Sequence, residues 1–229
     1  MTSPPTIRPI ETGSAPRATP QSAPVRPVVP QPTLEPAGAS TPTEDHFELA
    51  LYYQRINDFD SALIHYRALL ETSDGSAEVH NNLGLLYDQH GQRAEALAQF
   101  QRAITIDPKY VKAHNNRGVA LMRGNSPAAA AAEFRVALTV DPRNVESLVN
   151  LALLQKASGR VDDARDLLRR ALTIDPRNAG SHYNLAVVAD EGGDDATAIE
   201  HYRAFLRFGT VTHADLVGRV RARLATLGG

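Results

Sequence analysis

From residue 43 onward, small, large apolar and polar positions recur with a period of 34 residues. Units that start at Thr43, Ala77, Val111, Val145 and Ala179 follow one another without insertions. The eighth and twentieth places of every unit hold Gly or Ala, and the twenty-fourth place holds a large apolar residue. Because two antiparallel helices approach closely only where side chains are short, this spacing predicts a packed helix pair in each unit.

Turn and stop residues agree with two helices per unit. Gly or Asn occupies the fifteenth place, and these residues tolerate the left-handed backbone conformation that closes a helix. Three units end in an Asp-Pro pair, the first at Asp107-Pro108, where the missing amide hydrogen of proline stops the second helix. Each unit is therefore predicted to be a helix, a tight turn, a second helix and a stop.

This pattern resembles the tetratricopeptide repeat, and the resemblance extends over residues 43–212. The segment NNLGLLYDQHGQRAEALAQFQRAITIDP, residues 81–108, carries it almost completely. The resemblance implies an all-α fold, a right-handed superhelical solenoid of five antiparallel helix pairs in residues 43–76, 77–110, 111–144, 145–178 and 179–212. Residues 213–229 have apolar side chains at helical spacing and are predicted to form a capping helix over the last pair.

The first 42 residues differ in composition from the repeats. They contain 11 of the 15 prolines and few apolar residues, so we predict a disordered tail or linker with polyproline II character. Three roles remain open for this tail. It is a simple tether, a ligand for a domain that reads Pro-x-x-Pro spacings, or a segment that folds back onto the repeats and competes with partners.

Overall composition narrows the classes of function. The chain of 229 residues has no Cys, so disulfides and Cys-ligated metal sites are excluded. It carries 24 Lys and Arg against 26 Asp and Glu, and therefore lacks the basic excess that favours nucleic acid as a partner. No signal peptide is recognisable and no apolar stretch is long enough to span a membrane, which favours a cytoplasmic location.

The eight histidines are the first candidates for chemistry. Four of them share the fourth place of their units: His46, His80, His114 and His182. Repetition at one packing position favours a structural role over catalysis. The sequence also has no HExxH motif, no Gly-rich phosphate loop and no cluster of carboxylates with His. We therefore expect no enzymatic activity, no catalytic residue, no metal ion and no cofactor.

A row of asparagines is the strongest candidate for a binding site. Asn occupies the sixth place of four consecutive units, where each copy costs roughly 0.5 kcal/mol of helix propensity against Ala. The resemblance places first helices on the inner surface of the solenoid, and the row is similar to the asparagine ladder in the repeat arm of O-GlcNAc transferases. A side-chain amide offers the donor and the acceptor that a peptide backbone needs. The predicted partner-binding residues are Asn82, Asn116, Asn150, Asn184, Asn81, Asn115, Leu85, Val119 and Leu153.

The sequence thus predicts a non-catalytic scaffold or adaptor that holds an extended protein or peptide segment on the concave face of the repeats. Four or five hydrogen bonds contribute at most roughly 2–7 kcal/mol, whereas micromolar binding requires about 8 kcal/mol, so apolar contacts must supply the remainder. An alternative from another class is a structural module for assembly or self-association that acts through the solenoid ends or the convex face.

Overall fold

The computed structural model describes residues 42–72, 76–209 and 213–228, which form eleven α-helices and no strand. The first helices of the five units are α1 (Pro42–Arg55), α3 (Ala77–Gln89), α5 (Val111–Arg123), α7 (Val145–Ala157) and α9 (Ala179–Glu191). The second helices are α2 (Phe59–Thr72), α4 (Arg93–Ile106), α6 (Pro127–Val140), α8 (Val161–Ile174) and α10 (Asp195–Phe208). The last helix is α11 (Ala214–Thr226). Within these ranges, no helix combines the length and the apolar character needed to cross a bilayer.

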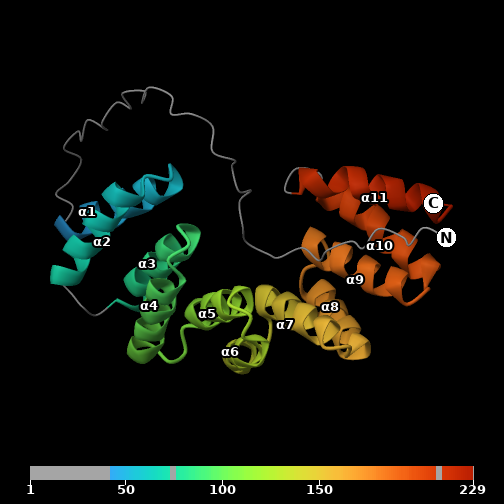
Figure 1. Ribbon diagram of the computed structural model, residues 1–229, viewed down its shortest axis with the longest axis horizontal. Helices are drawn as coiled ribbons and strands as arrows, with labels where there is room; N and C mark the ends of the chain where they lie inside the picture. Colours follow the sequence, from blue (N-terminus) through green and yellow to red (C-terminus); the bar gives the residue numbers. More distant parts are fainter. Residues whose placement is uncertain (1–41, 73–75, 210–212, 229) are drawn as a thin grey trace.

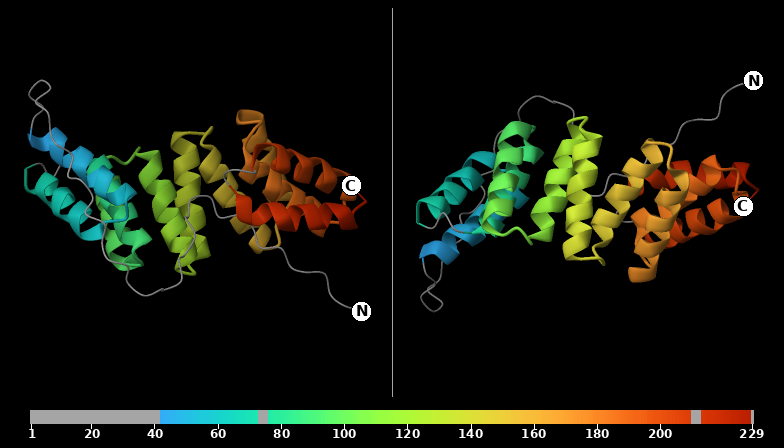
Figure 2. Two further views of the ribbon diagram at one scale, coloured as in Figure 1. Left: turned by 90° about the horizontal axis from the view of Figure 1, so that it is seen from above. Right: turned by 90° about the horizontal axis from the view of Figure 1, so that it is seen from below.

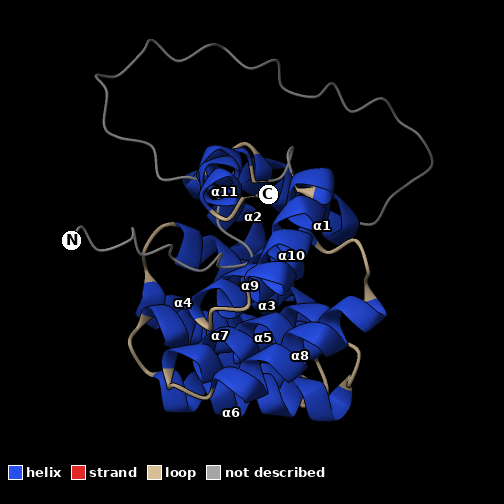
Figure 3. Cartoon of the chain, turned by 90° about the vertical axis from the view of Figure 1, so that its right-hand side faces the viewer, coloured by secondary structure: helices blue, strands red, loops and turns tan. Residues whose placement is uncertain are grey.

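The helices form antiparallel pairs that stack side by side into a bent row (Figure 1). Within each unit the two helices pack against each other, and each second helix also packs against the first helix of the next unit. The first helices contact one another from α3 to α5, α7 and α9, as expected for elements on the inside of a bend. The direction of the helices turns gradually along the row (Figure 2), and short loops join them (Figure 3). The predicted all-α solenoid of five helix pairs and a cap is confirmed.

The small residues of the repeat lie where the two helices of a pair meet. A Cβ atom added at Gly84 would lie 2.6 Å from the ring of Phe100, and one added at Gly118 would lie 2.5 Å from the ring of Phe134. The large side chains at the twenty-fourth place are fully buried in all five units: Tyr66, Phe100, Phe134, Leu168 and Tyr202. The predicted packing of small against large residues therefore forms the core of each pair.

The turn and stop residues have the predicted conformations. The five residues at the fifteenth place, Asn57, Gly91, Asn125, Gly159 and Gly193, have φ angles between 58° and 77°, which is the left-handed region. At each Asp-Pro stop, the Asp side chain also forms a hydrogen bond with the backbone that follows the helix. The carboxylates of Asp107, Asp141 and Asp175 accept hydrogen bonds from the backbone amides two residues later at 2.9–3.1 Å. These bonds satisfy the backbone where proline interrupts the helix.

The first helix begins at Pro42, one residue before the predicted start of the repeats. Proline fits this place because the first turn of a helix has amide groups without intrahelical partners, so its missing hydrogen breaks no bond. Residues 1–41 lie outside the described residues. They make up nearly all of the tail that was predicted to be disordered and for which three roles were considered.

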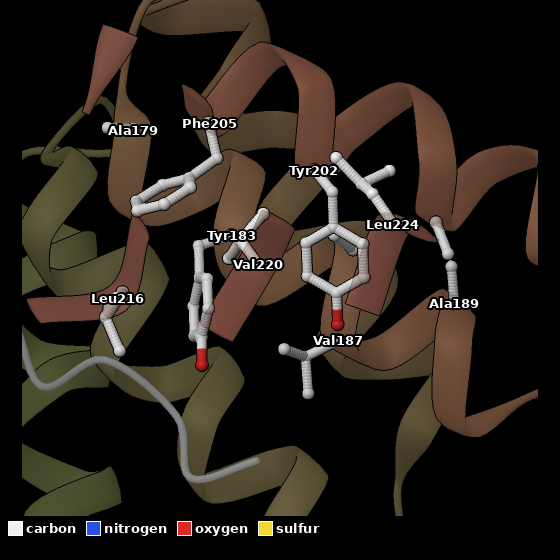
Figure 4. Close-up of a cluster of buried hydrophobic side chains, with 11 residues drawn as sticks. Ala179, Tyr183, Val187, Ala189, Tyr202, Phe205, Leu216, Val220 and Leu224 are labelled. Atoms are coloured by element: carbon white, nitrogen blue, oxygen red, sulfur yellow. The ribbon is translucent and has the colours of Figure 1, made fainter. Parts of the chain in front are cut away.

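The capping helix α11 covers the apolar end of the last unit. Its Leu216, Val220 and Leu224 share one buried cluster with Tyr183 of α9 and Tyr202 of α10 (Figure 4). A polar contact strengthens this end of the row. Nη2 and Nε of Arg223 donate to the two carboxylate oxygens of Asp190 at 2.6 and 2.8 Å, and the Tyr202 hydroxyl donates to the same carboxylate at 3.0 Å.

Candidate functional site

Hydrogen bonds join the amide side chains of successive first helices. Nδ2 of Asn116 donates to Oδ1 of Asn81 at 2.9 Å, and Nδ2 of Asn150 donates to Oδ1 of Asn115 at 3.1 Å. In both bonds the sixth-place amide reaches the fifth-place amide of the preceding unit, 35 residues earlier in the chain. These bonds join neighbouring units, and they occupy amide atoms of residues predicted to bind a partner.

Exposure to solvent divides the nine predicted residues into two groups. Asn82, Asn116, Leu85 and Val119, which lie on α3 and α5, are partly exposed. The buried group consists of Asn81, Asn115, Asn150, Asn184 and Leu153. Within the described residues, Nδ2 of Asn82 and Oδ1 of Asn116 make no hydrogen bond, although the other amide atom of each residue does. The inner side of α3 and α5 therefore presents one open donor and one open acceptor.

The last amide of the row differs from the others. Its neighbour 35 residues earlier is Val149, whose side chain cannot accept a hydrogen bond. Asn184 is 2% exposed, and in the described part of the chain neither its Nδ2 nor its Oδ1 has a hydrogen-bond partner. A buried polar group without a partner costs about 1–3 kcal/mol of stability. The repeat pattern alone does not reveal this difference, because it aligns sixth-place residues with one another and not with the preceding fifth place.

The fourth-place histidines pair with second-helix residues nineteen positions later. The pairs are His46–His65, His80–Gln99, His114–Glu133 and His182–His201, with Nδ1 of the first residue 2.7–3.1 Å from its partner atom. The fourth unit, which has Leu148 in place of His, has the apolar Leu167 at the partner position. The sequence contains this signal, but the spacing along a single helix does not reveal it, because the two positions lie on different helices. The pairs satisfy buried rings and so explain why His recurs at one place.

In each of the two His–His pairs, burial lowers the pKa of the histidine on the second helix. Nε2 of His182 donates to the Pro176 carbonyl at 3.0 Å, so in the neutral ring Nδ1 accepts the proton that His201 Nδ1 donates. Burial lowers the pKa of His201 below its ordinary value; His182 and Arg169 lower it further, while Glu200 acts in the opposite direction. Burial and the adjacent His46 lower the pKa of His65 in the same way.

We expect the protein to lose stability as the pH falls below about 6.5. In the unfolded chain His65 and His201 bind protons near that pH, but in the folded chain they bind them only at lower pH, so protonation favours unfolding. Each His contributes a slope of at most about 1.4 kcal/mol per pH unit. Urea unfolding between pH 8 and pH 5 measures the slope. The matched variant His65→Gln with His201→Gln copies the His–Gln pair of the second unit and should have a smaller slope; an unchanged slope would assign the effect to other groups.

The third unit contains a charged network inside the helix pair. Arg117 stands at the seventh place, where the other four units have Leu, and its Nη1 pairs with one carboxylate oxygen of Glu133. The other oxygen of Glu133 lies 2.8 Å from Nδ1 of His114. In the described ranges, no group of three or more His, Asp or Glu side chains could hold a metal ion. The network therefore neutralises the Arg117 charge within the unit.

The amino-acid sequence matches a known repeat family along most of its length. A model of the tetratricopeptide repeat matches residues 47–111, 83–145 and 149–210, and a second model of the same repeat matches residues 120–172. A comparison with curated protein sequences finds no match.

Several solved structures share the arrangement of helices. PilW, a widely conserved type IV pilus biogenesis factor, is 22% identical with a TM-score of 0.72, covering 82% of this chain and 87% of that chain. TTC0263, a thermophilic TPR protein of Thermus thermophilus, is 19% identical with a TM-score of 0.64, covering 81% and 98%. YrrB, a TPR protein with an unusual peptide-binding site, is 18% identical with a TM-score of 0.57, covering 76% and 90%. The repeat matches and the shared fold lead to one conclusion: the chain belongs to the tetratricopeptide repeat family.

Proposed function

We propose that the chain is a non-catalytic scaffold or adaptor that holds an extended segment of a partner protein on the concave face of its repeats. One observation carries this proposal. Asn82 on α3 has an open donor, and Asn116 on the adjacent α5 has an open acceptor. A peptide unit has one acceptor and one donor, so it can bond to both amides.

Apolar side chains beside the amides provide the rest of the binding energy. Leu85 and Val119 lie one turn after Asn82 and Asn116 on the same helices and are partly exposed. The second place of units two to four holds charges that alternate in sign, Glu78, Lys112 and Glu146, so these residues favour neither acidic nor basic partners. An extended segment with apolar side chains fits this surface, and YrrB, with its peptide-binding site, has a similar fold.

Self-association through the convex face is a second candidate function. The second helices expose large apolar side chains: Ile64 on α2 is 65% exposed, and Val136 on α6 is 41% exposed. Val140, one turn after Val136, is also exposed. Contiguous exposed apolar residues often mark an interface with another protein. The two candidate functions use opposite faces of the row and can therefore be tested separately.

Two variants distinguish the two faces. Asn82→Ala removes the open donor of the inner face, and Val136→Glu places a charge on the outer face. Peptides that bind the full chain are first selected from a random-peptide display library, and their affinities are then measured by fluorescence anisotropy. We expect Asn82→Ala to weaken binding by about 2- to 10-fold, the value of one hydrogen bond, and Val136→Glu to leave binding unchanged.

Light scattering of the same proteins tests the alternative. We expect neither variant to change the molar mass, and circular dichroism controls for loss of helix. If Val136→Glu lowers the molar mass while Asn82→Ala leaves peptide affinity intact, assembly through the convex face replaces the proposal. A display library that yields no binder would also count against a peptide-binding inner face.

A further inference from the structure

We propose that one edge of the repeat row binds an extended acidic segment of a partner protein, and that Arg177 and Arg207 bind its carboxylates. The helices run across the row, so their ends lie along two edges (Figure 2). One edge, which we call the loop edge, contains the loops between units, the starts of the first helices and the ends of the second helices. This surface differs from the concave face, so the inference goes beyond the proposed function.

The loop edge carries a positive charge that the composition of the whole chain hides. Between residues 77 and 209, the places nearer this edge, 1–7 and 24–34 of each unit, contain 11 Lys and Arg and 5 Asp and Glu. Places 8–23 lie nearer the turns inside the pairs, at the turn edge, and contain 5 Lys and Arg and 11 Asp and Glu. The two edges cancel in the net charge, and an acidic partner is attracted to the loop edge.

The repeat aligns basic side chains along the loop edge. The residue after each Asp-Pro stop is basic in three consecutive loops: Lys109, Arg143 and Arg177. All three are exposed, and in the described part of the chain none of them forms an ion pair. The Asp of each stop instead accepts a hydrogen bond from the backbone amide of that same basic residue. An extended segment with spaced carboxylates can therefore contact one loop after another.

The ring of Phe208, at the end of α10, restrains two of these cations. The guanidinium carbons of Arg177 and Arg207 lie 5.6 and 5.4 Å from its centroid. Phe208 is itself stacked on the His182 ring at 5.8 Å, and the bond from His182 to the Pro176 carbonyl fixes that ring. Cation–π contact reduces the freedom of both guanidinium groups, so binding a ligand costs less conformational entropy.

The two guanidinium groups are suited to a carboxylate. They repel each other across one ring, and a bound anion would relieve this repulsion. Within the described ranges neither pairs with a carboxylate, and both residues are exposed, so a ligand can reach them. A guanidinium offers two parallel N–H donors to the two oxygens of a carboxylate. A nucleic acid or an anionic membrane fits less well, because a large polyanion would also approach the acidic turn edge.

Binding of a defined acidic peptide tests the site. Fluorescein-labelled (Asp-Gly)₆ is titrated with the full chain in about 50 mM NaCl, and fluorescence anisotropy reports the affinity. We expect Arg177→Ala with Arg207→Ala to weaken binding by about 5- to 30-fold, and about 300 mM NaCl to weaken wild-type binding by about 10-fold or more. No binding of this peptide to the wild type would overturn the proposal.

A matched variant separates the site from net charge. Arg93→Ala with Arg160→Ala removes two exposed arginines from the turn edge, so the net charge changes equally, and the affinity should stay the same. Equal losses in the two double variants would overturn the proposal. Arg177→Lys with Arg207→Lys keeps both charges but not the forked donors, and we expect an intermediate loss. Unchanged affinity of this variant would overturn the role assigned to the guanidinium groups. Circular dichroism melts control for folding.

Other occupants of the loop edge would give different results. Tighter binding of a single-stranded oligothymidylate or of phosphatidylserine vesicles than of (Asp-Gly)₆, lost in Arg177→Ala with Arg207→Ala, would overturn the proposal. So would a lower molar mass of this variant in light scattering without peptide binding, which would assign the edge to a second copy of the chain. Asn82→Ala should leave the affinity for (Asp-Gly)₆ unchanged, so failure at the loop edge is distinguishable from failure of the concave-face function.

Discussion

Replacing Gly118 by Ala is expected to lower the free energy of unfolding by about 1–3 kcal/mol. In an open helix position the same change would raise it by about 1 kcal/mol, because Ala has the higher helix propensity. At Gly118 the clash outweighs this gain, since the added Cβ would lie 2.5 Å from Cε1 of Phe134, a ring with no exposed surface into which it could move. Urea unfolding followed by circular dichroism measures the change.

A control and a rescue make this expectation specific. Gly218 on α11 is also helical, but a Cβ there meets nothing within 4 Å, so Gly218→Ala should be neutral or stabilising. Adding Phe134→Leu to Gly118→Ala copies the Ala152–Leu168 pair of the fourth unit and should recover part of the loss, with a coupling energy between the two sites. Equal stability of Gly118→Ala and Gly218→Ala would contradict the packing argument.

Replacing Asp190 by Ala is expected to loosen α11 at a cost of about 2–3 kcal/mol. The change removes two charge-assisted bonds from Arg223 and one from Tyr202, and hydrogen bonds to charged groups contribute about 1.5–3 kcal/mol each. We assign a value well below the full sum because the Arg223 side chain is 30% exposed and can be hydrated instead. Hydrogen exchange should show lost protection in α11, with α3 and α4 unaffected, since repeats interact only with their neighbours.

Acid should abolish the effect of this substitution. The hydrogen bond from Arg223, followed by that from Tyr202, holds the pKa of Asp190 below its ordinary value of 3.8. The carboxylate therefore contributes its stability above pH 3.8, and the contribution disappears as the pH falls through the lower pKa of the folded state. The difference between the wild type and Asp190→Ala should shrink accordingly. Asp162→Ala is the control, because its exposed ion pair with Arg165 is worth at most about 1 kcal/mol.

The sequence was sufficient to predict the repeat, its turns and its cap. These features depend on contacts within one unit, such as Gly118 with Phe134, and on local backbone preferences, such as those of Gly91, so a regular period reveals them. The asparagine row is also evident in the sequence, but its four members look equivalent there because they occupy equal places in the repeat.

The spatial offset between units explains why the repeat pattern does not reveal which asparagines bond to each other. Asn116 bonds to Asn81 and not to Asn82, because neighbouring first helices are displaced by about one residue relative to the repeat period. A comparison at 34 residues cannot reveal a contact at 35, and it hides the consequence of Val149 for Asn184. The exposure of each residue likewise depends on the packing around it, since Asn82 and Asn116 are partly exposed whereas Asn150 and Asn184 are buried.

The matched pairs at the eighth and twenty-fourth places limit how such a gene can be recombined. Gly118 accommodates Phe134, whereas Ala152 faces the smaller Leu168, so the helices of the third and fourth units are each fitted to their own partner, while the first and fifth units combine Ala with Tyr. A recombination breakpoint between two units keeps the two helices of each fitted pair together. A crossover within a unit would set Ala152 against Phe134, or leave a void between Gly118 and Leu168. Recombination between the third and fourth repeats should therefore tolerate breakpoints in the loop between the pairs and select against those in the turns inside them.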